Sequence, residues 1–153
     1  MAIEVVQIAL PWPMEPGAPL PTLKASDRSE LRVSYFEAST EVHRRVILRF
    51  TGCSQFIFGY PNDESLPGHP LYQFGLGYYG LFEVRGSDWG HRLRTQNLVS
   101  FPRTDLNAPD GRRHFVVTFH DQTLECLARG IEGRLIDDEI EAQDGSTNEW
   151  LSF

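Results

Sequence analysis

The segment from residue 113 to residue 129 carries the pattern that most restricts how this chain can fold. Its sequence, RHFVVTFHDQTLECLAR, alternates between side chains of opposite character in two short runs around a polar turn. Because successive side chains of a β-strand point to opposite faces, this pattern predicts a β-hairpin with one apolar face. The apolar face comprises Phe115, Val117, Phe119, Leu124, Cys126 and Ala128. A shift of one residue would expose that face to water, which constrains the assignment of the faces.

The opposite face of this hairpin is chemically mixed. If Asp121 and Gln122 form the turn, His114 lies opposite Arg129 on the neighbouring strand. The face then carries His114, Val116, Thr118, His120, Thr123, Glu125, Leu127 and Arg129. Three interpretations are open at this point. The face is the solvated outside of the sheet, it lines a ligand-binding interior, or it performs acid–base chemistry, for which a histidine beside a carboxylate is suited.

The remaining chain predicts a mainly β protein. Apolar and polar residues alternate in several further short runs, and turn-forming residues separate these runs. The predicted strands are residues 3–10, 30–37, 42–50, 54–60 and 80–85, and one short α-helix is predicted over about residues 88–96. Such spacing is typical of antiparallel barrels and sandwiches. We expect an antiparallel β-barrel or a strongly curved sheet.

Length and charge distribution indicate one domain. A chain of 153 residues has the size of a single domain. We therefore expect one β-rich domain over residues 1–153, with a proline-rich loop at residues 11–29. Residues 132–153 form an acidic C-terminal segment, in which seven carboxylates oppose Arg134 alone. This segment is either a solvated tail or a docking strip for a basic protein partner.

Composition and charge argue against several classes of function. A duplex-DNA-binding protein needs a basic stripe to displace counterions, whereas this chain has a formal net charge of −7 and no such stripe. No apolar run approaches the ~18 residues of a membrane span. The N-terminus lacks the basic start of a secretory signal. We therefore expect a cytoplasmic protein that binds neither nucleic acid nor membranes.

The loop at residues 61–70 and the aromatic residues after it add candidate ligand-binding groups. Asp63, Glu64 and His69 either satisfy backbone donors in turns or belong to a lid that brings them over the mixed hairpin face. Tyr72 and Tyr79 belong to an aromatic cluster, which is either core or part of a binding surface.

Neither a metal site nor an organic cofactor is predicted. The histidines and Glu125 have the chemistry to ligate zinc or iron, but no pair of them has a diagnostic spacing. Along a strand, His114 and His120 would lie about 20 Å apart, too far for one ion. The chain also has no GxSxG or HExxH motif and no phosphate-binding glycine loop.

Three segments carry a resemblance to other proteins. They are FGYPNDESLPGHPLY at residues 58–72, GLGYYGLFEV at residues 75–84 and RHFVVTFHDQTLEC at residues 113–126, and together they resemble a group of short uncharacterised bacterial proteins. The resemblance covers roughly residues 55–130. It implies a bacterial, cytoplasmic origin, and it implies no activity and no site residues.

Three classes of function are compatible with these features. The first, which we favour, is binding of a small organic ligand at a polar and aromatic pocket. The candidate ligand-binding residues are Thr118, Arg129, Asp63, Glu64, His69, Tyr72 and Tyr79. The second is a cofactor-independent acid–base enzyme of lyase, isomerase or cyclase type, with His120 or His114 as acid or base and Glu125 as orienting carboxylate. The third is an interaction protein of immunity type that uses the acidic segment.

Overall fold

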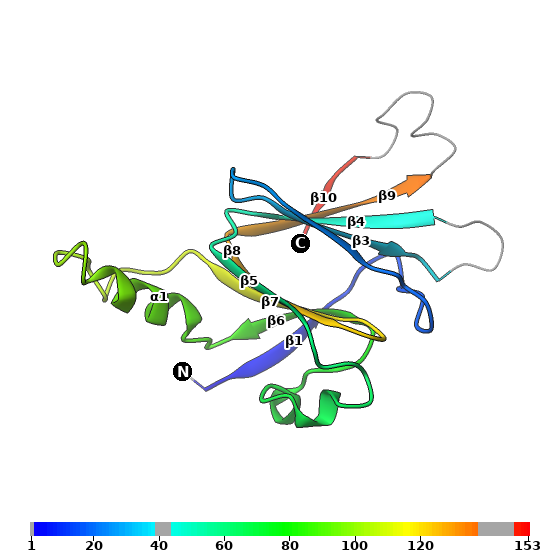
Figure 1. The fold of residues 1–153 in the computed structure, drawn as a ribbon, viewed down its shortest axis with the longest axis horizontal. Coiled ribbons are helices and arrows are strands. Elements are labelled where there is room, and N and C mark those ends of the chain that lie inside the picture. Colours follow the sequence, from blue (N-terminus) through cyan, green and yellow to red (C-terminus); the bar gives the residue numbers. More distant parts are fainter. Residues whose placement is uncertain (1, 39–43, 138–148) are drawn as a thin grey trace.

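The computed structural model describes residues 2–38, 44–137 and 149–153. Within these ranges the chain is mainly β, as predicted, and forms one α-helix and two short 3-10 helices (Figure 1). The strands are β1 (Glu4–Ile8), β2 (Thr22–Ala25), β3 (Leu31–Phe36), β4 (Arg44–Thr51), β5 (Gln55–Gly59), β6 (Gly80–Arg85), β7 (Arg113–Thr118), β8 (Thr123–Ala128), β9 (Gly130–Asp137) and β10 (Leu151–Ser152). The helices are η1 (Leu66–Gly68), η2 (Tyr72–Phe74) and α1 (Trp89–Asn97).

The strands form two antiparallel sheets that pack face to face (Figure 1). One sheet has the strand order β1-β6-β7-β8-β5, and the other has the order β10-β9-β4-β3-β2. Among the described residues no strand pairing closes a barrel, so two packed sheets replace the expected barrel. Apolar and polar residues alternate in the same way in barrels and in sandwiches. Only the pairing of strands that are distant in sequence distinguishes the two architectures.

An apolar core lies between the sheets, and the hairpin of β7 and β8 contributes one side of it. All six residues of the predicted apolar face are buried there, which confirms the assignment of the faces. The other sheet contributes Leu31, Val33, Tyr35, Val46, Leu48 and Phe50. Aromatic pairs join the two sides, since the ring of Phe119 packs on Tyr35 at 5.8 Å and that of Phe115 on Phe50 at 5.5 Å between centroids.

Two chain segments pass directly from one sheet to the other. β4 leads into β5 through three residues, and β8 leads into β9 through Arg129 alone. The N–H of Arg129 donates to the carbonyl of Thr51 at 2.8 Å, so the two segments stay hydrogen-bonded at this corner. Arg129 is exposed and packs over Gly52, where φ is 60° and a side chain would meet the arginine. Arg129 thus lies in the corner after β8, and His114 pairs with Leu127, so the prediction that Arg129 lies opposite His114 is wrong.

The register of the β7–β8 hairpin differs from the prediction by two residues. Thr118 pairs with Thr123, so the connecting loop contains four residues instead of two. A shift of two residues leaves every strand side chain on its predicted face but changes its neighbours. Glu125 consequently lies opposite Val116 rather than Thr118, and His120 belongs to the loop rather than to the sheet.

Three strands lie in segments that were not predicted as strands. β2 occurs within the expected proline-rich loop, and β9 and β10 lie almost entirely in the acidic C-terminal segment. β10 pairs with β9, and the ring of Phe153 packs on Trp12 at 6.2 Å, so the last residues dock on the body of the protein. Residues 138–148, which carry most of the predicted docking strip, lie outside the described residues.

In the described ranges no helix is long and apolar enough to cross a membrane.

Replacing Phe119 with alanine tests the shared core. Phe119 is 1% exposed, and truncation of a buried aromatic side chain costs about 3–5 kcal/mol because it removes apolar contacts and leaves a cavity. Chemical denaturation should show a loss of that size in the free energy of unfolding.

The matched control is Phe101→Ala, because Phe101 is 67% exposed. This control should change the free energy of unfolding by less than about 0.5 kcal/mol. Equal losses for the two variants would contradict a core centred on the β7–β8 hairpin.

Candidate functional site

The mixed face of the β7–β8 hairpin is the outer face of its sheet, and the segment from residue 60 to residue 79 covers much of it. Figure 1 shows η1 and η2 of this segment, drawn in green, beyond the sheet on the side away from the core. A second apolar cluster fills the interface and consists of Val5, Leu66, Leu71, Leu76, Phe82, Val84 and Val116. The covering leaves His114 8%, Thr118 2% and Thr123 4% exposed. Most of this face is therefore neither solvated nor the lining of a barrel.

A chain of hydrogen-bonded polar side chains crosses this covered face. The Nε2 of His69 lies 3.0 Å from one carboxylate oxygen of Glu125, and the Nε2 of His114 lies 3.0 Å from the other. The Nδ1 of His114 lies 2.8 Å from the hydroxyl of Ser87. His69 comes from the covering segment and Glu125 from β8. His114 comes from β7, and Ser87 lies in the turn between β6 and α1. The fold thus joins four separate parts of the chain through side chains.

Glu125 is ionised in this chain. Burial by itself raises the pKa of its carboxyl, but hydrogen bonds from His114 and His69 outweigh burial and lower the pKa to about 2. The N–H of Leu71 donates to the Nδ1 of His69 at 3.0 Å. A neutral His69 therefore carries its proton on Nε2 and donates it to Glu125.

A second polar cluster lies at the loop end of the hairpin. The hydroxyl of Tyr79 donates to Asp63 at 2.6 Å, and the Nδ1 of His120 lies 2.7 Å from the same carboxylate oxygen. The hydrogen bond from Tyr79 is the main reason that the pKa of Asp63 is lowered, with a smaller contribution from His120. Because His120 is in the loop, it contacts this cluster and is separate from Glu125, contrary to the predicted shared face.

The remaining predicted residues have different positions. Thr118 is buried and donates to the carbonyl of Gly77 at 2.9 Å, which ties the sheet to the covering segment. Glu64 is exposed. Tyr72 packs on Tyr78 at 6.2 Å between ring centroids. Of the ten predicted site residues, the structure joins His69, His114 and Glu125 in one group and Asp63, Tyr79 and His120 in another.

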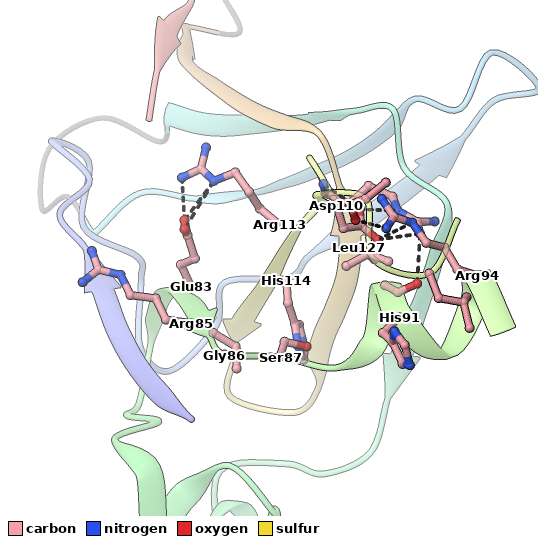
Figure 2. Close-up of a pocket in the computed structure, with 15 residues that line it drawn as sticks. Glu83, Arg85, Gly86, Ser87, His91, Arg94, Asp110, Arg113, His114 and Leu127 are labelled. Carbon is pink, nitrogen blue, oxygen red and sulfur yellow. Dashed lines mark hydrogen bonds and ion pairs between the residues drawn. The ribbon is translucent and has the colours of Figure 1, made fainter. Parts of the chain in front are cut away.

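A pocket of about 300 Å³ lies at the Ser87 end of the polar chain. It is bordered by the end of β6, the start of α1, the segment before β7 and the first residues of β7. Figure 2 shows Ser87 beside His114, with Arg94 and Asp110 to one side and the pair of Arg113 and Glu83 to the other. Among the predicted site residues, only His114 lines this pocket.

Ion pairs hold the walls of the pocket. Arg112 donates to both carboxylate oxygens of Asp110, and this interaction is the main reason that the pKa of Asp110 falls to about 2. Arg94 donates to the carbonyls of Ala108 and Pro109, and these hydrogen bonds connect α1 to the loop that follows it. The guanidinium of Arg113 pairs with Glu83 at 2.7 Å. These contacts hold together the walls that the loop and the two strands contribute.

Sequence patterns alone did not identify Ser87 or the arginines as site residues. By its sequence, Ser87 or Asp88 could cap the short helix; Asp88 occupies the cap position, and Ser87 accepts a hydrogen bond from the N–H of Trp89 at 3.3 Å. The available signal was the placement of Gly86 and Ser87 between a strand and a helix, but such turns are common. The pocket arginines come from three segments that only the fold brings together, namely the end of β6 (Arg85), α1 (Arg94) and the segment at the start of β7 (Arg112 and Arg113).

In the described parts of the chain, no group of three or more histidine, cysteine, aspartate or glutamate side chains could hold a metal ion. Comparisons with protein-family models, curated proteins and solved structures found no match. The site's own residues therefore carry the functional argument.

Replacing Glu125 with glutamine should cost most stability at neutral pH. A carboxyl whose pKa falls on folding stabilises the folded state above its ordinary pKa of 4.5, and this contribution disappears as the pH falls toward about 2. At neutral pH, wild type and Glu125→Gln should differ by about 2–3 kcal/mol in the free energy of unfolding. The two values should converge as the pH is lowered below 4.5.

Glu64→Gln is the control, because Glu64 is an exposed carboxylate in the covering segment. It should change stability by less than about 0.5 kcal/mol at every pH. A difference between wild type and Glu125→Gln that does not change with pH would show that ionisation of Glu125 contributes nothing.

Proposed function

We propose that the protein binds a small organic anion in the pocket between β7 and the start of α1. The charge of the pocket lining carries this proposal. Four arginines, Arg85, Arg94, Arg112 and Arg113, oppose two carboxylates, Glu83 and Asp110. The whole chain, in contrast, has a formal net charge of −7. A positive cleft in a negatively charged protein concentrates anionic ligands locally.

Arg85 is the arginine most available to a ligand. It is exposed at the end of β6 and forms no ion pair with any described residue, whereas the other three arginines already contact protein oxygens. The side chains of Leu106 and Leu127 supply apolar wall, and Ser87 and His114 supply hydrogen-bonding groups. Small-molecule sites combine apolar walls with a few polar groups in this way, and about 300 Å³ is the small end of their range.

Acid–base catalysis in the same pocket is the second candidate function. It is supported by His114, which borders the pocket while its Nε2 is held by an ionised carboxylate. A histidine that is oriented by Glu125 can exchange a proton with a bound ligand through its other ring nitrogen. As in the sequence-based prediction, His114 would be the acid or base and Glu125 the carboxylate that orients it. His120 does not border this pocket and has no role in it.

Titration with benzoate, phenyl phosphate and neutral benzamide tests anion binding. We expect at least one of the two anions, but not benzamide, to raise the melting temperature of wild type, because ligand at about 100 times its Kd adds about 2.7 kcal/mol to stability. Arg85→Gln should raise the Kd of that anion about tenfold, since one charge-assisted contact contributes roughly 1.5 kcal/mol.

Arg92→Gln is the matched control. Arg92 lies on α1 and is exposed, but it pairs with Asp88 and does not border the pocket. This variant should bind the anion like wild type. If Arg85→Gln and Arg92→Gln have equal affinity, or if benzamide stabilises the protein as much as benzoate does, the proposal is wrong.

A further inference from the structure

We propose that Ser87 is the nucleophile of an acyl-transfer site and that the pocket hydrolyses small esters. The evidence is a linear arrangement of three side chains from three separate elements. The hydroxyl of Ser87 lies 2.8 Å from the Nδ1 of His114, and the Nε2 of the same ring lies 3.0 Å from Glu125. A nucleophile within hydrogen-bonding distance of a base, with the base oriented by a third group, is the arrangement that covalent catalysis requires.

The direction of the hydrogen bonds follows from the charge of Glu125. An ionised carboxylate can only accept, so a neutral His114 carries its proton on Nε2 and donates it to Glu125. The Nδ1 of His114 is then an acceptor, and the hydroxyl of Ser87 is the group that donates to it. The N–H of Trp89 donates to the oxygen of Ser87, which agrees with this direction. The hydroxyl proton therefore already points at the base that would remove it.

Contacts with Trp89, Ser87 and Glu125 hold the imidazole ring of His114 in this orientation. The ring of Trp89 packs edge-on against it at 4.9 Å between centroids, and the indole N–H donates to Gln55 at 2.7 Å. His69 occupies the second oxygen of Glu125 and so restrains the carboxylate. Trp89, His69 and Glu125 are positioning residues, because they act through His114 and do not border the pocket.

Ser87 and His114 both border the pocket, so a bound ester can reach them (Figure 2). Gly86 has a φ of 75°, which permits the sharp turn that places Ser87 between β6 and α1. The first turn of a helix leaves backbone N–H groups without intrahelical partners, and Gly90 in this turn also borders the pocket. Because the N–H of Trp89 already donates to Ser87, the N–H of Gly90 is the donor that we assign to a developing oxyanion. The preference for an ester that carries a negative charge rests on the proposed function.

The reaction balances with water as the only co-reactant. The oxygen of Ser87 attacks the ester carbonyl carbon, and its proton moves to the Nδ1 of His114, whose positive charge is paired with Glu125. The carbon–oxygen bond to the alcohol then breaks, and the departing alcohol takes that proton. Water attacks the resulting acyl-serine with His114 again as base. The carboxylic acid leaves, the hydroxyl of Ser87 is restored, and no atom is oxidised or reduced.

A fluorophosphonate probe and two chromogenic esters test this proposal on the full chain. Peptide mapping of wild type should locate the phosphonate adduct on Ser87. Wild type should hydrolyse mono-4-nitrophenyl succinate faster than 4-nitrophenyl acetate. Ser87→Ala should lose the adduct and at least about 100-fold of the hydrolysis rate, the size of effect expected when a nucleophile is removed. Ser100→Ala, which removes an exposed serine after α1, should retain both.

Four further variants, one of them a double variant, test the roles of the individual side chains. Ser87→Cys keeps a nucleophile at this position, and its thiol should react with iodoacetamide faster than the same thiol in the double variant with His114→Gln. His69→Gln and Glu125→Gln should lower kcat while KM stays within about twofold, because a positioning residue acts on the reacting proton and not on ligand binding.

The outcomes separate this inference from the proposed function. An adduct on Ser87 supports the inference, even if Arg85→Gln leaves anion binding unchanged and the anion proposal is lost. If wild type binds benzoate or phenyl phosphate but gives no adduct on Ser87 and no hydrolysis above that of Ser87→Ala, the acyl-transfer inference is overturned and the binding function remains. An adduct on any other serine would also overturn it.

Discussion

The ionised Glu125 is the group on which the site depends. Its two oxygens receive one hydrogen bond from His69 in the covering segment and one from His114 in β7, so a single carboxylate connects the loop to the sheet. The two contacts lower its pKa to about 2 against the effect of burial. A carboxylate with only 20% of its side chain exposed is costly to ionise without such partners, and the partners in turn take their orientation from it. The orientation of His114 toward Ser87 follows from this arrangement.

Because the covering segment packs on the outer face of the sheet that contains β7 and β8, this sheet has an apolar cluster on each of its two faces. On the inner face, aromatic and aliphatic side chains pack against the second sheet. On the outer face, a smaller apolar cluster surrounds the polar chain and excludes water from most of it. In surroundings of low polarity, hydrogen bonds between charged and neutral groups are stronger than in water. The pocket lies where this covering ends, so one end of the buried polar chain meets a ligand-sized space.

Some properties of the hairpin could be derived from its residues alone. The apolar character of Phe115, Val117 and Phe119 required one face to be buried, and the structure confirms this assignment. The register was misjudged by two residues, because local sequence does not decide between a two-residue and a four-residue turn. A register error of two residues leaves each strand side chain on its predicted face but changes the residue opposite it. Glu125 was therefore expected opposite Thr118, whereas it lies opposite Val116, closer to His114.

The sequence by itself determined the period of its strands, the location of its one clear helix in the described ranges and, within the paired part of the β7–β8 hairpin, which side chains share a face. These features follow from contacts within a few residues, and alternation encodes them directly. Only the tertiary structure decided that the sheets pack in pairs, that residues 60–79 cover the outer face, and that Ser87 meets His114. The physical reason is that these contacts join residues 27 or more positions apart, whose approach depends on the packing of the whole chain.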